Sequence, residues 1–358
     1  MNLYKELEHY ACMYECIKEE KRPILLYGMG DGAEKIHKEL TKRGIDIKGV
    51  FASEDFVRGQ SFLGFRVLSL SEAETNFADF TAVLCFALEG EKAGVLETVK
   101  ERHKLFSPNL PVFGDGVLDK KNIFSQIEKA QKLLDYLADD KSKELFINLL
   151  KYNITGNTEY LFLNKDAFSY PNGFFLHNKR HIDVGAYDGD TVREYTSYNN
   201  IYSDIVAFEP DIYSYKKLIK NTYKIRNVVC ENAAVNDKNG YETITTKKNR
   251  GSFIDKRSNQ QIKTVSIDNY CNHLNINNKG IEVGSIKIDA EGADRQVLYG
   301  MVNTIYNNKP DLMVALYHRA YDILDIPLLI KKYNHKYKLY LRKKDYVPAW
   351  DVFLLAKH

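Results

Sequence analysis

Several features are scarce or missing in this 358-residue sequence, and each absence argues against a class of protein. No apolar stretch approaches the roughly 18 residues of a membrane-spanning helix, so we expect no membrane insertion. The first twenty residues alternate charged and apolar positions and lack the continuous apolar core of a signal peptide. No run of five like charges occurs among the 51 basic and 48 acidic residues, and the net charge is only +3. Nucleic acid is therefore not expected as a partner.

The sequence is also poor in cysteine, with five residues in all. Cys12 and Cys16 lie one helical turn apart, whereas Cys85, Cys230 and Cys271 are scattered through apparent strands or a helix. Scattered cysteines in a chain without a signal peptide indicate reduced thiols and a cytoplasmic location, with a zinc site as a minor alternative.

Length and a hydrophobic content of 44% allow two domains of ordinary size. A pattern of strand, glycine turn, helix and strand begins at Ile24, and a second α/β series begins near residue 175. The charged amphipathic stretch between them predicts one or two connecting helices. We therefore expect an N-terminal helix (1–21), a Rossmann-like α/β domain (22–116), a helical connector (117–174) and a second α/β domain (175–358).

The segment HIDVGAYDGDT, residues 181–191, has two glycines in a turn between a strand and a helix. Glycines let a backbone approach a ligand closely. Asp183, Asp188 and Asp190 would repel the pyrophosphate of NAD or FAD, whose site should be electropositive. S-adenosylmethionine has no phosphate and carries an ammonium and a sulfonium, so the same acids favour it. The alternative is a plain turn whose aspartates only cap a helix.

Two acidic residues take separate roles in this hypothesis. Asp183 would pair with the ammonium or its bound water, because a carboxylate beside the sulfonium would stabilise the reactant more than the transition state. Glu209 ends the next strand, and an acid about 20 residues beyond the turn can accept hydrogen bonds from both ribose hydroxyls. Together, the acid-rich turn and this spacing predict a cofactor that contains a nucleoside.

A second glycine turn, YGMGDGAEK at 27–35, follows the first strand of the N-terminal unit. Gly28, Gly30 and Ala33 match a dinucleotide-binding spacing, but Phe51-Ala52-Ser53 stands where a ribose-binding acid is expected. Two alternatives follow from this turn. The protein is an NAD-linked oxidoreductase that uses this turn, or the N-terminal domain is a non-catalytic docking or dimerisation module.

Polar residues follow the next two strands of the second domain. The segment SIKIDAEG carries Asp289 and Glu291, and the strand after it ends in Tyr317-His318-Arg319, so these groups should meet at one sheet edge. His318 is a candidate general base for an acceptor hydroxyl, and a hydrogen bond to neighbouring backbone is the alternative. Asp289 and Glu291 are weak candidates for a divalent cation, since no third ligand is evident.

Six segments together resemble successive motifs of the FkbM family of S-adenosylmethionine-dependent methyltransferases. They span about residues 175–357 and are HIDVGAYDGDT, IVAFEPD, ENAAVND, KTVSIDNY, IKIDAEGADRQVLYGM and ALYHRAYDI. The resemblance implies a class I methyltransferase fold, an α/β fold with a seven-stranded, mostly parallel sheet covered by helices on both faces, whose last strand is antiparallel. The N-terminal unit looks like the Rossmann-type domain attached to some bacterial sugar-modifying enzymes.

The resemblance also implies roles for individual residues. Ribose would meet Glu209, and adenine would lie beside Asn232 and Ala233. Asp289 would stand near both cofactor and methyl group, with Glu291 beside it, and Pro210 is a further candidate cofactor-binding residue. The cofactor turn would comprise Asp183, Gly185, Ala186, Tyr187, Asp188, Gly189 and Thr191. Tyr187 stands where many relatives have asparagine.

These observations favour a cytoplasmic S-adenosylmethionine-dependent O-methyltransferase. Its acceptor would be a hydroxyl of a sugar, a glycan precursor as in polysaccharide biosynthesis, or another small polar metabolite. The catalytic candidates are His318, Asp289 and Glu291. The N-terminal domain could in addition hold a homo-oligomer together.

Overall fold

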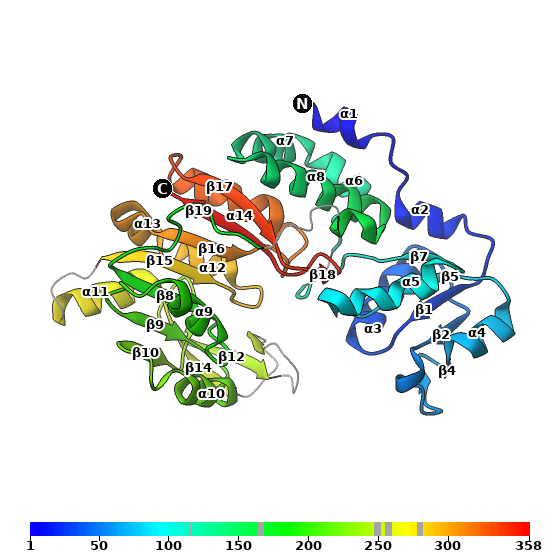
Figure 1. Ribbon diagram of the computed structural model, residues 1–358, viewed down its shortest axis with the longest axis horizontal. Coiled ribbons are helices and arrows are strands. Elements are labelled where there is room, and N and C mark those ends of the chain that lie inside the picture. The colour runs from blue at the N-terminus through cyan, green and yellow to red at the C-terminus, as the bar shows by residue number, and fades with distance from the viewer. Residues whose placement is uncertain (115, 163–167, 247–251, 255–259, 278–281) are drawn as a thin grey trace.

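The computed structural model describes residues 1–114, 116–162, 168–246, 252–254, 260–277 and 282–358. Its two α/β domains lie side by side, with a layer of helices along one side of the pair (Figure 1).

The first domain is built on a six-stranded sheet, in the order β3-β4-β2-β1-β5-β7, that is parallel except for β3. Its central strands β1, β2 and β5 are buried along their whole length, as expected for a parallel sheet that is covered on both faces. The strands are β1 (Ile24–Tyr27), β2 (Gly49–Phe51), β3 (Ser61–Phe62), β4 (Phe65–Leu68), β5 (Thr81–Leu84) and β7 (Lys104–Phe106). The helices are α3 (Asp31–Lys42), α4 (Leu70–Phe77) and α5 (Val95–Lys100), with the 3-10 turns η1 (Glu54–Phe56) and η2 (Gly90–Gly94).

The predicted helix after the N-terminal glycine turn is confirmed as α3. Ala33, Ile36 and Leu40 lie on its buried face, as their three- and four-residue spacing requires. Gly44 follows the helix with a φ of +70°, the left-handed conformation that commonly ends a helix.

The helical layer differs from the prediction in the number of its helices. Residues 1–21 form two helices, α1 (Leu3–Leu7) and α2 (Met13–Lys18), and α1 packs on the connector whereas α2 belongs to the core of the first domain. The connector has three helices instead of one or two: α6 (Lys120–Ser125), α7 (Ile127–Tyr136) and α8 (Asp140–Thr155), followed by η3 (Thr158–Leu161). Asp139 starts α8 by accepting a hydrogen bond from the Ser142 amide, which separates α8 from α7.

The second domain contains the predicted seven-stranded sheet. Its order is β10-β9-β8-β15-β16-β19-β17, and the last strand, β19, runs antiparallel to both neighbours. The strands are β8 (Arg180–Val184), β9 (Ile205–Phe208), β10 (Val228–Glu231), β15 (Val283–Ile288), β16 (Asp311–Ala315), β17 (Lys338–Lys343) and β19 (Val352–Lys357). The helices are α9 (Asp190–Tyr198), α10 (Ile212–Thr222), α11 (Ile267–Asn277), α12 (Asp294–Tyr299), α13 (Val302–Asn308) and α14 (Asp322–Tyr333).

A small four-stranded sheet lies beside the main one. Its strands are β11 (Ala234–Val235), β12 (Gly240–Thr246), β13 (Ser252–Ile254) and β14 (Gln260–Val265). The strand β12, GYETITT, has few apolar residues, and β13 has only three residues, so neither has a clear strand pattern in the sequence.

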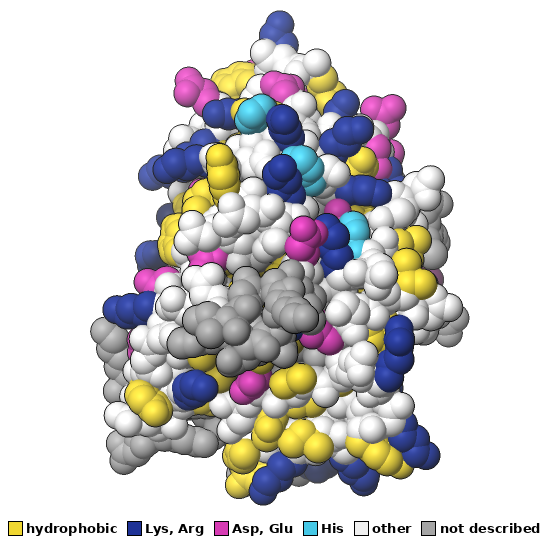
Figure 2. All heavy atoms as spheres, turned by 90° about the vertical axis from the view of Figure 1, so that its left-hand side faces the viewer, with side chains coloured by type: hydrophobic (Ala, Val, Ile, Leu, Met, Phe, Trp, Pro, Cys, Tyr) yellow, Lys and Arg dark blue, Asp and Glu magenta, His cyan; other side chains and the backbone are white. Residues whose placement is uncertain are grey.

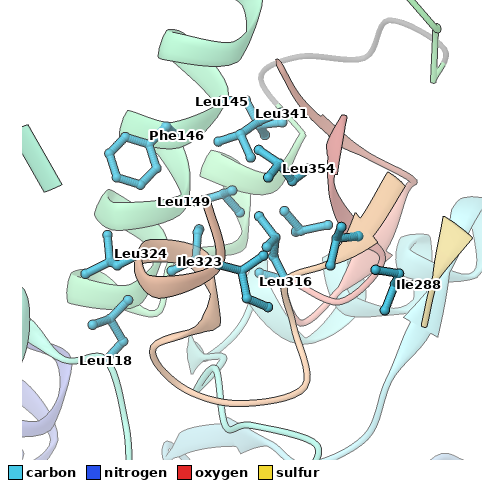
Figure 3. Packing of buried hydrophobic residues seen from close by; sticks show 14 of the residues in the cluster. Leu118, Leu145, Phe146, Leu149, Ile288, Leu316, Ile323, Leu324, Leu341 and Leu354 are labelled. Atoms are coloured by element: carbon cyan, nitrogen blue, oxygen red, sulfur yellow. The ribbon is translucent and has the colours of Figure 1, made fainter. Parts of the chain in front are cut away.

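The two domains are joined by a continuous hydrophobic cluster that passes through the connector. Leu145 and Leu149 of α8 lie over Leu341 and Leu354 of the second sheet, next to Ile323 of α14 (Figure 3). A two-stranded ladder adds a backbone link, since β6 (Leu88–Glu89) of the first domain pairs with β18 (Tyr346–Val347) of the second. The site described next therefore receives residues from both domains.

Candidate active site

A pocket of about 720 Å³ opens at the carboxyl ends of β8, β9, β15 and β16. This edge is where ligands bind in open α/β sheets. Phe208, Ala233 and Val235 give part of the wall an apolar character, and Glu209 and Asp289 bring carboxylates to it. A volume of this size is within the range of small-molecule sites.

The glycine turn between β8 and α9 contributes Gly185 and Tyr187 to the wall of the pocket. Gly185 and Gly189 have φ values of +74° and +86°. A Cβ on Gly185 would collide with the Asp289 carbonyl oxygen, and one on Gly189 would lie 2.8 Å from Cγ2 of Thr222. Both glycines are thus required by packing against neighbouring elements as well as by their backbone conformation. Tyr187, between them, also has a positive φ, of +47°.

Glu209 closes the turn from the side of β9. One carboxylate oxygen accepts a hydrogen bond from the Tyr187 amide and the other from the Asp211 amide, each at 2.8 Å. The side chain is buried, at 6% exposure, and burial raises its pKa to about 7 even though both amides favour the charged form. Because two backbone amides hold the Glu209 carboxylate, this hydrogen-bond acceptor has a fixed position at the pocket wall.

The predicted site residues divide into two groups. Eight line the pocket: Gly185, Tyr187, Thr191, Glu209, Pro210, Ala233, Asp289 and Glu291. The other six do not appear in its wall: Asp183, Ala186, Asp188, Gly189, Asn232 and His318. The side-chain amide of Asn232 donates hydrogen bonds to the Glu209 and Pro210 carbonyls, so it ties the end of β10 to the end of β9.

Asp183 is fully buried behind the turn and is paired with a lysine that the sequence analysis did not single out. Lys287 Nζ lies 3.2 Å from Asp183 Oδ1 and donates a 2.7 Å hydrogen bond to the Gly185 carbonyl. The Thr191 hydroxyl donates to the other oxygen of Asp183. Burial disfavours the charge on Lys287, but Asp183 and Asp289 raise its pKa to about 12. The lysine therefore stays protonated and fixes the turn against β15.

His318 is enclosed by carboxylates, not by backbone groups. Its Nδ1 lies 2.7 Å from Asp294 Oδ2 and its Nε2 lies 3.2 Å from Asp289 Oδ1. Burial disfavours the imidazolium, yet the two carboxylates raise the pKa of His318 well above its usual value. Both ring nitrogens then carry protons and face acceptors, an arrangement that leaves no lone pair for accepting a substrate proton.

Asp289 is the central anion of this network. Lys287 and His318 lower its pKa to about 2 against the opposing effect of burial, and the Tyr317 hydroxyl donates to Oδ1 at 3.1 Å. The described side chains thus form a chain in which three acids alternate with two bases: Asp183, Lys287, Asp289, His318 and Asp294.

Glu291 differs from Asp289 although it lies only two residues away. Burial raises its pKa to about 7, and its Oε2 is 3.8 Å from His318 Nε2. Its φ of +49° is uncommon for a residue with a side chain and is found preferentially at functional sites. The Glu291 side chain is therefore placed at the pocket with a proton affinity suited to transfer near neutral pH.

Within the described residues, no group of three His, Cys, Asp or Glu side chains is arranged to hold a metal ion. The five cysteines are free thiols, as expected. In the same described part of the chain, no helix is both long enough and apolar enough to cross a bilayer.

The N-terminal glycine turn has a different environment. A Cβ on Gly28 would lie 2.5 Å from Cδ1 of Phe86, so a side chain of the protein already covers this glycine. Ser53, at the position where a ribose-binding acid is expected, makes a 3.0 Å hydrogen bond with the Tyr27 hydroxyl. Neither feature fits the diphosphate and ribose of a dinucleotide.

The seven-stranded order with an antiparallel last strand defines the second domain as a class I methyltransferase fold. Residues 183–347 match the methyltransferase FkbM domain family, so the C-terminal part of the chain carries a methyltransferase domain of this family. A search of curated proteins gave no match.

Among solved structures, the chain is similar to methyltransferase FkbM from Methylobacillus flagellatus KT. The TM-score is 0.69 at 18% identity, over 96% of this chain and 92% of that chain, and at this identity the likeness shows the fold. A putative rRNA methylase from Clostridium thermocellum gives a TM-score of 0.31 at 9% identity, over 51% of this chain and 87% of that chain. Aeropyrum pernix fibrillarin, solved with natively bound S-adenosyl-L-methionine, gives a TM-score of 0.30 at 10% identity, over 51% of this chain and 67% of that chain. The fold assignment rests on the first of these.

Sequence reasoning missed Lys287 and the contribution of the N-terminal domain to the site. A lysine inside the otherwise apolar strand VGSIKI was a usable signal, because a buried charge needs a partner. The contribution of Glu89 to the wall of the first pocket had no comparable signal in the sequence, since it depends on the pairing of β6 with β18.

Proposed function

We propose that this methyltransferase transfers a methyl group from S-adenosylmethionine to a hydroxyl of a sugar, a glycan precursor or another small polar metabolite. The observation that carries the proposal is the acid-rich network at the carboxyl ends of β8 and β15, in which three acids contact two bases next to Glu209. Such a site favours a cationic ligand over a phosphate-bearing one.

The residues of the pocket suit the parts of this cofactor. Glu209 offers carboxylate oxygens to ribose hydroxyls, and Phe208, Ala233 and Val235 provide apolar surface for adenine. Asp183 acts on the cofactor turn from behind, because it pairs with Lys287, which in turn donates to the Gly185 carbonyl. When bound, S-adenosylmethionine supplies a methyl group on a positively charged sulfur.

We assign the general base to Glu291 in place of His318. The carboxylate of Glu291 lines the pocket and accepts the hydroxyl proton as the acceptor oxygen bonds to the methyl carbon. Protonated His318 holds Asp289 and faces Glu291, so it positions these two acids and limits the build-up of negative charge. The Tyr317 hydroxyl donates a hydrogen bond to Oδ1 of Asp289 and so helps to orient this carboxylate.

Two measurements test the proposed function. Calorimetry with S-adenosylhomocysteine should show binding, and label transfer from methyl-labelled S-adenosylmethionine should modify a saccharide within a panel of sugars, nucleotide sugars and oligosaccharides. Absence of binding at millimolar S-adenosylhomocysteine would contradict the cofactor. Transfer only to amines or thiols would contradict a hydroxyl acceptor.

The other expectations about partners and location stay proposals. Basic and acidic side chains are interspersed on the outer face of the methyltransferase domain shown in Figure 2, which supports a small-molecule partner over nucleic acid. Five free thiols fit a reducing, cytoplasmic location. A homo-oligomer through the N-terminal domain is tested by light scattering of the whole protein.

An NAD-linked oxidoreductase is the weaker function, because Phe86 covers Gly28 and no acid follows β2 at the ribose position.

A further inference from the structure

A second cavity, of about 750 Å³, lies between the two domains. It shares Glu291 and Ala293 with the first pocket, so the two spaces meet at the residue to which we assign the general base. The other residues that line this second cavity are not among those assigned to the cofactor. Its position on the other side of Glu291 is where a second reactant can reach the same carboxylate.

The N-terminal domain provides one wall of the cavity. Asp31, Gly32 and Lys35 at the start of α3 and Phe86 and Ala87 after β5 lie on this wall. Gly32 is required by helix packing, since a Cβ there would collide with the Cys85 carbonyl oxygen. The glycine turn thus holds α3 close to β5 and leaves the first turn of α3 facing the methyltransferase domain.

The methyltransferase domain provides the opposite wall. Trp350 is the single tryptophan of the sequence, and its buried indole N–H has no hydrogen-bond partner among the described residues. The indole ring lines the cavity, whereas its N–H is enclosed by the protein. Arg319 is anchored by a 2.7 Å hydrogen bond from Nε to the Gly292 carbonyl, and Gln296 lies on the same wall.

We propose that this interdomain cavity is the acceptor site, and that it takes an uncharged, polyhydroxylated ring such as a neutral saccharide. The inference takes the reaction, methyl transfer, from the proposed function. The location of the site is argued from the cavity alone. The N-terminal domain then serves methyl transfer as half of the acceptor site, not as a dinucleotide-binding domain.

The mixed charge of the cavity selects the class of acceptor. Three acids line it, Asp31, Glu242 and Glu291, together with two basic residues, Lys35 and Arg319. This set has no surplus of positive charge for a nucleoside diphosphate, whereas the hydroxyls of a neutral ring can donate to acids and accept from bases. Phe86, Phe113 and Trp350 add flat apolar surface for the ring face.

Trp350 makes occupancy of the cavity measurable without any methyl transfer. Titration of the full-length protein, saturated with S-adenosylhomocysteine, is followed by tryptophan emission. The probes are methyl glycosides of hexoses, 6-deoxyhexoses and N-acetylhexosamines, a neutral oligosaccharide fraction of a cell extract, and UDP-glucose. A neutral saccharide should shift the emission, and UDP-glucose should not. In parallel, label transfer is measured with each probe.

Ala87→Phe is the variant that fills the cavity, since Ala87 lines it but is absent from the wall of the cofactor pocket. The expected result is loss of the emission shift and at least a tenfold rise in KM for the saccharide, with affinity for S-adenosylhomocysteine unchanged within twofold. Lys42→Phe is the matched control, because the Lys42 side chain is 74% exposed at the end of α3. It should behave as the wild type. Glu291→Gln should keep the emission shift and lose transfer.

The outcomes separate this inference from the proposed function. Transfer that proceeds with wild-type KM in Ala87→Phe overturns the acceptor site and leaves the function standing. A saccharide-dependent emission shift that Ala87→Phe abolishes supports the site even if no methyl is transferred to oxygen, in which case only the function fails. A shift with UDP-glucose alone overturns the neutral class, and no shift or transfer with any probe overturns both.

Discussion

The protein contains two glycine turns that look alike in sequence and differ in what surrounds them. In both, a buried strand leads through glycines with positive φ into a helix. At Gly28 the space over the turn is filled by Phe86, and Ser53 lies two residues beyond the neighbouring strand β2. At Gly185 the turn borders a pocket, and the neighbouring strand ends in Glu209. A glycine spacing therefore specifies a tight turn, whereas the neighbouring strand end and the covering side chains decide whether a ligand can bind.

The two turns also use their glycines for similar packing. Gly32 allows α3 to approach the backbone of Cys85, and Gly185 allows the second turn to approach the backbone of Asp289. Close packing of a helix or turn on a strand is thus common to both domains. The acidic network that contains Lys287 and His318 lies in the second domain.

The largest expected effect concerns Glu291, the acid at the pocket of the methyltransferase domain. Glu291→Gln removes the proton acceptor while keeping the shape of the side chain, so kcat should fall by about 10²–10⁴-fold. Affinity for S-adenosylhomocysteine should change little, which calorimetry checks. His318→Asn, which removes the imidazolium but keeps a donor, should reduce kcat less. An equal or larger loss in His318→Asn would return the base to His318.

The next prediction compares glycines of the two turns. Gly185→Ala forces a Cβ against the Asp289 carbonyl at a positive φ, and should cost about 2–5 kcal/mol of the free energy of unfolding and weaken S-adenosylhomocysteine binding. Gly30→Ala meets open space but keeps the strained backbone, so it should cost about 1–3 kcal/mol. Denaturant unfolding and calorimetry measure both. Weakened binding in Gly30→Ala would show that the N-terminal turn also contributes to cofactor binding.

A third prediction concerns the strand ends beside the turns. Glu209→Gln replaces a carboxylate acceptor with a neutral amide, so S-adenosylhomocysteine affinity should fall by about 1.5–3 kcal/mol. Ser53→Ala, at the matching end of β2, should leave that affinity unaltered. Thermal unfolding of both variants separates a binding effect from a loss of fold. Equal affinities for Glu209→Gln and the wild type would remove Glu209 from the cofactor site.

The smallest predicted effect is the pH dependence of cofactor binding. Burial raises the pKa of Glu209 to about 7, and only the carboxylate accepts from both ribose hydroxyls. Affinity for S-adenosylhomocysteine should therefore rise by roughly tenfold between pH 6 and pH 8, as expected for one titrating proton. Glu291 also has a pKa of about 7, so the titration is done in Glu291→Gln. A flat profile there would mean that Glu209 does not titrate on binding.

Much of the architecture was predictable from the sequence because it depends on local pattern. Apolar runs such as IVAF, the turn at 185–189 and the acid that ends β9 fixed the α/β class, the strand edge and the residue offered to ribose. The helix count was predicted less well, since the break between α7 and α8 depends on a cap at Asp139 inside an otherwise continuous amphipathic pattern.

The sequence by itself thus determined two α/β domains and an acid-rich edge in the second, because strand burial and turn chemistry are set by neighbouring residues. Only the tertiary structure decided which charges pair. Lys287 meets Asp183 from an adjacent strand, and His318 is enclosed by Asp289 and Asp294. It also decided that α3 and Trp350 face the same cavity. These contacts join residues far apart in the chain, and proton affinity and cavity shape depend on such neighbours in space.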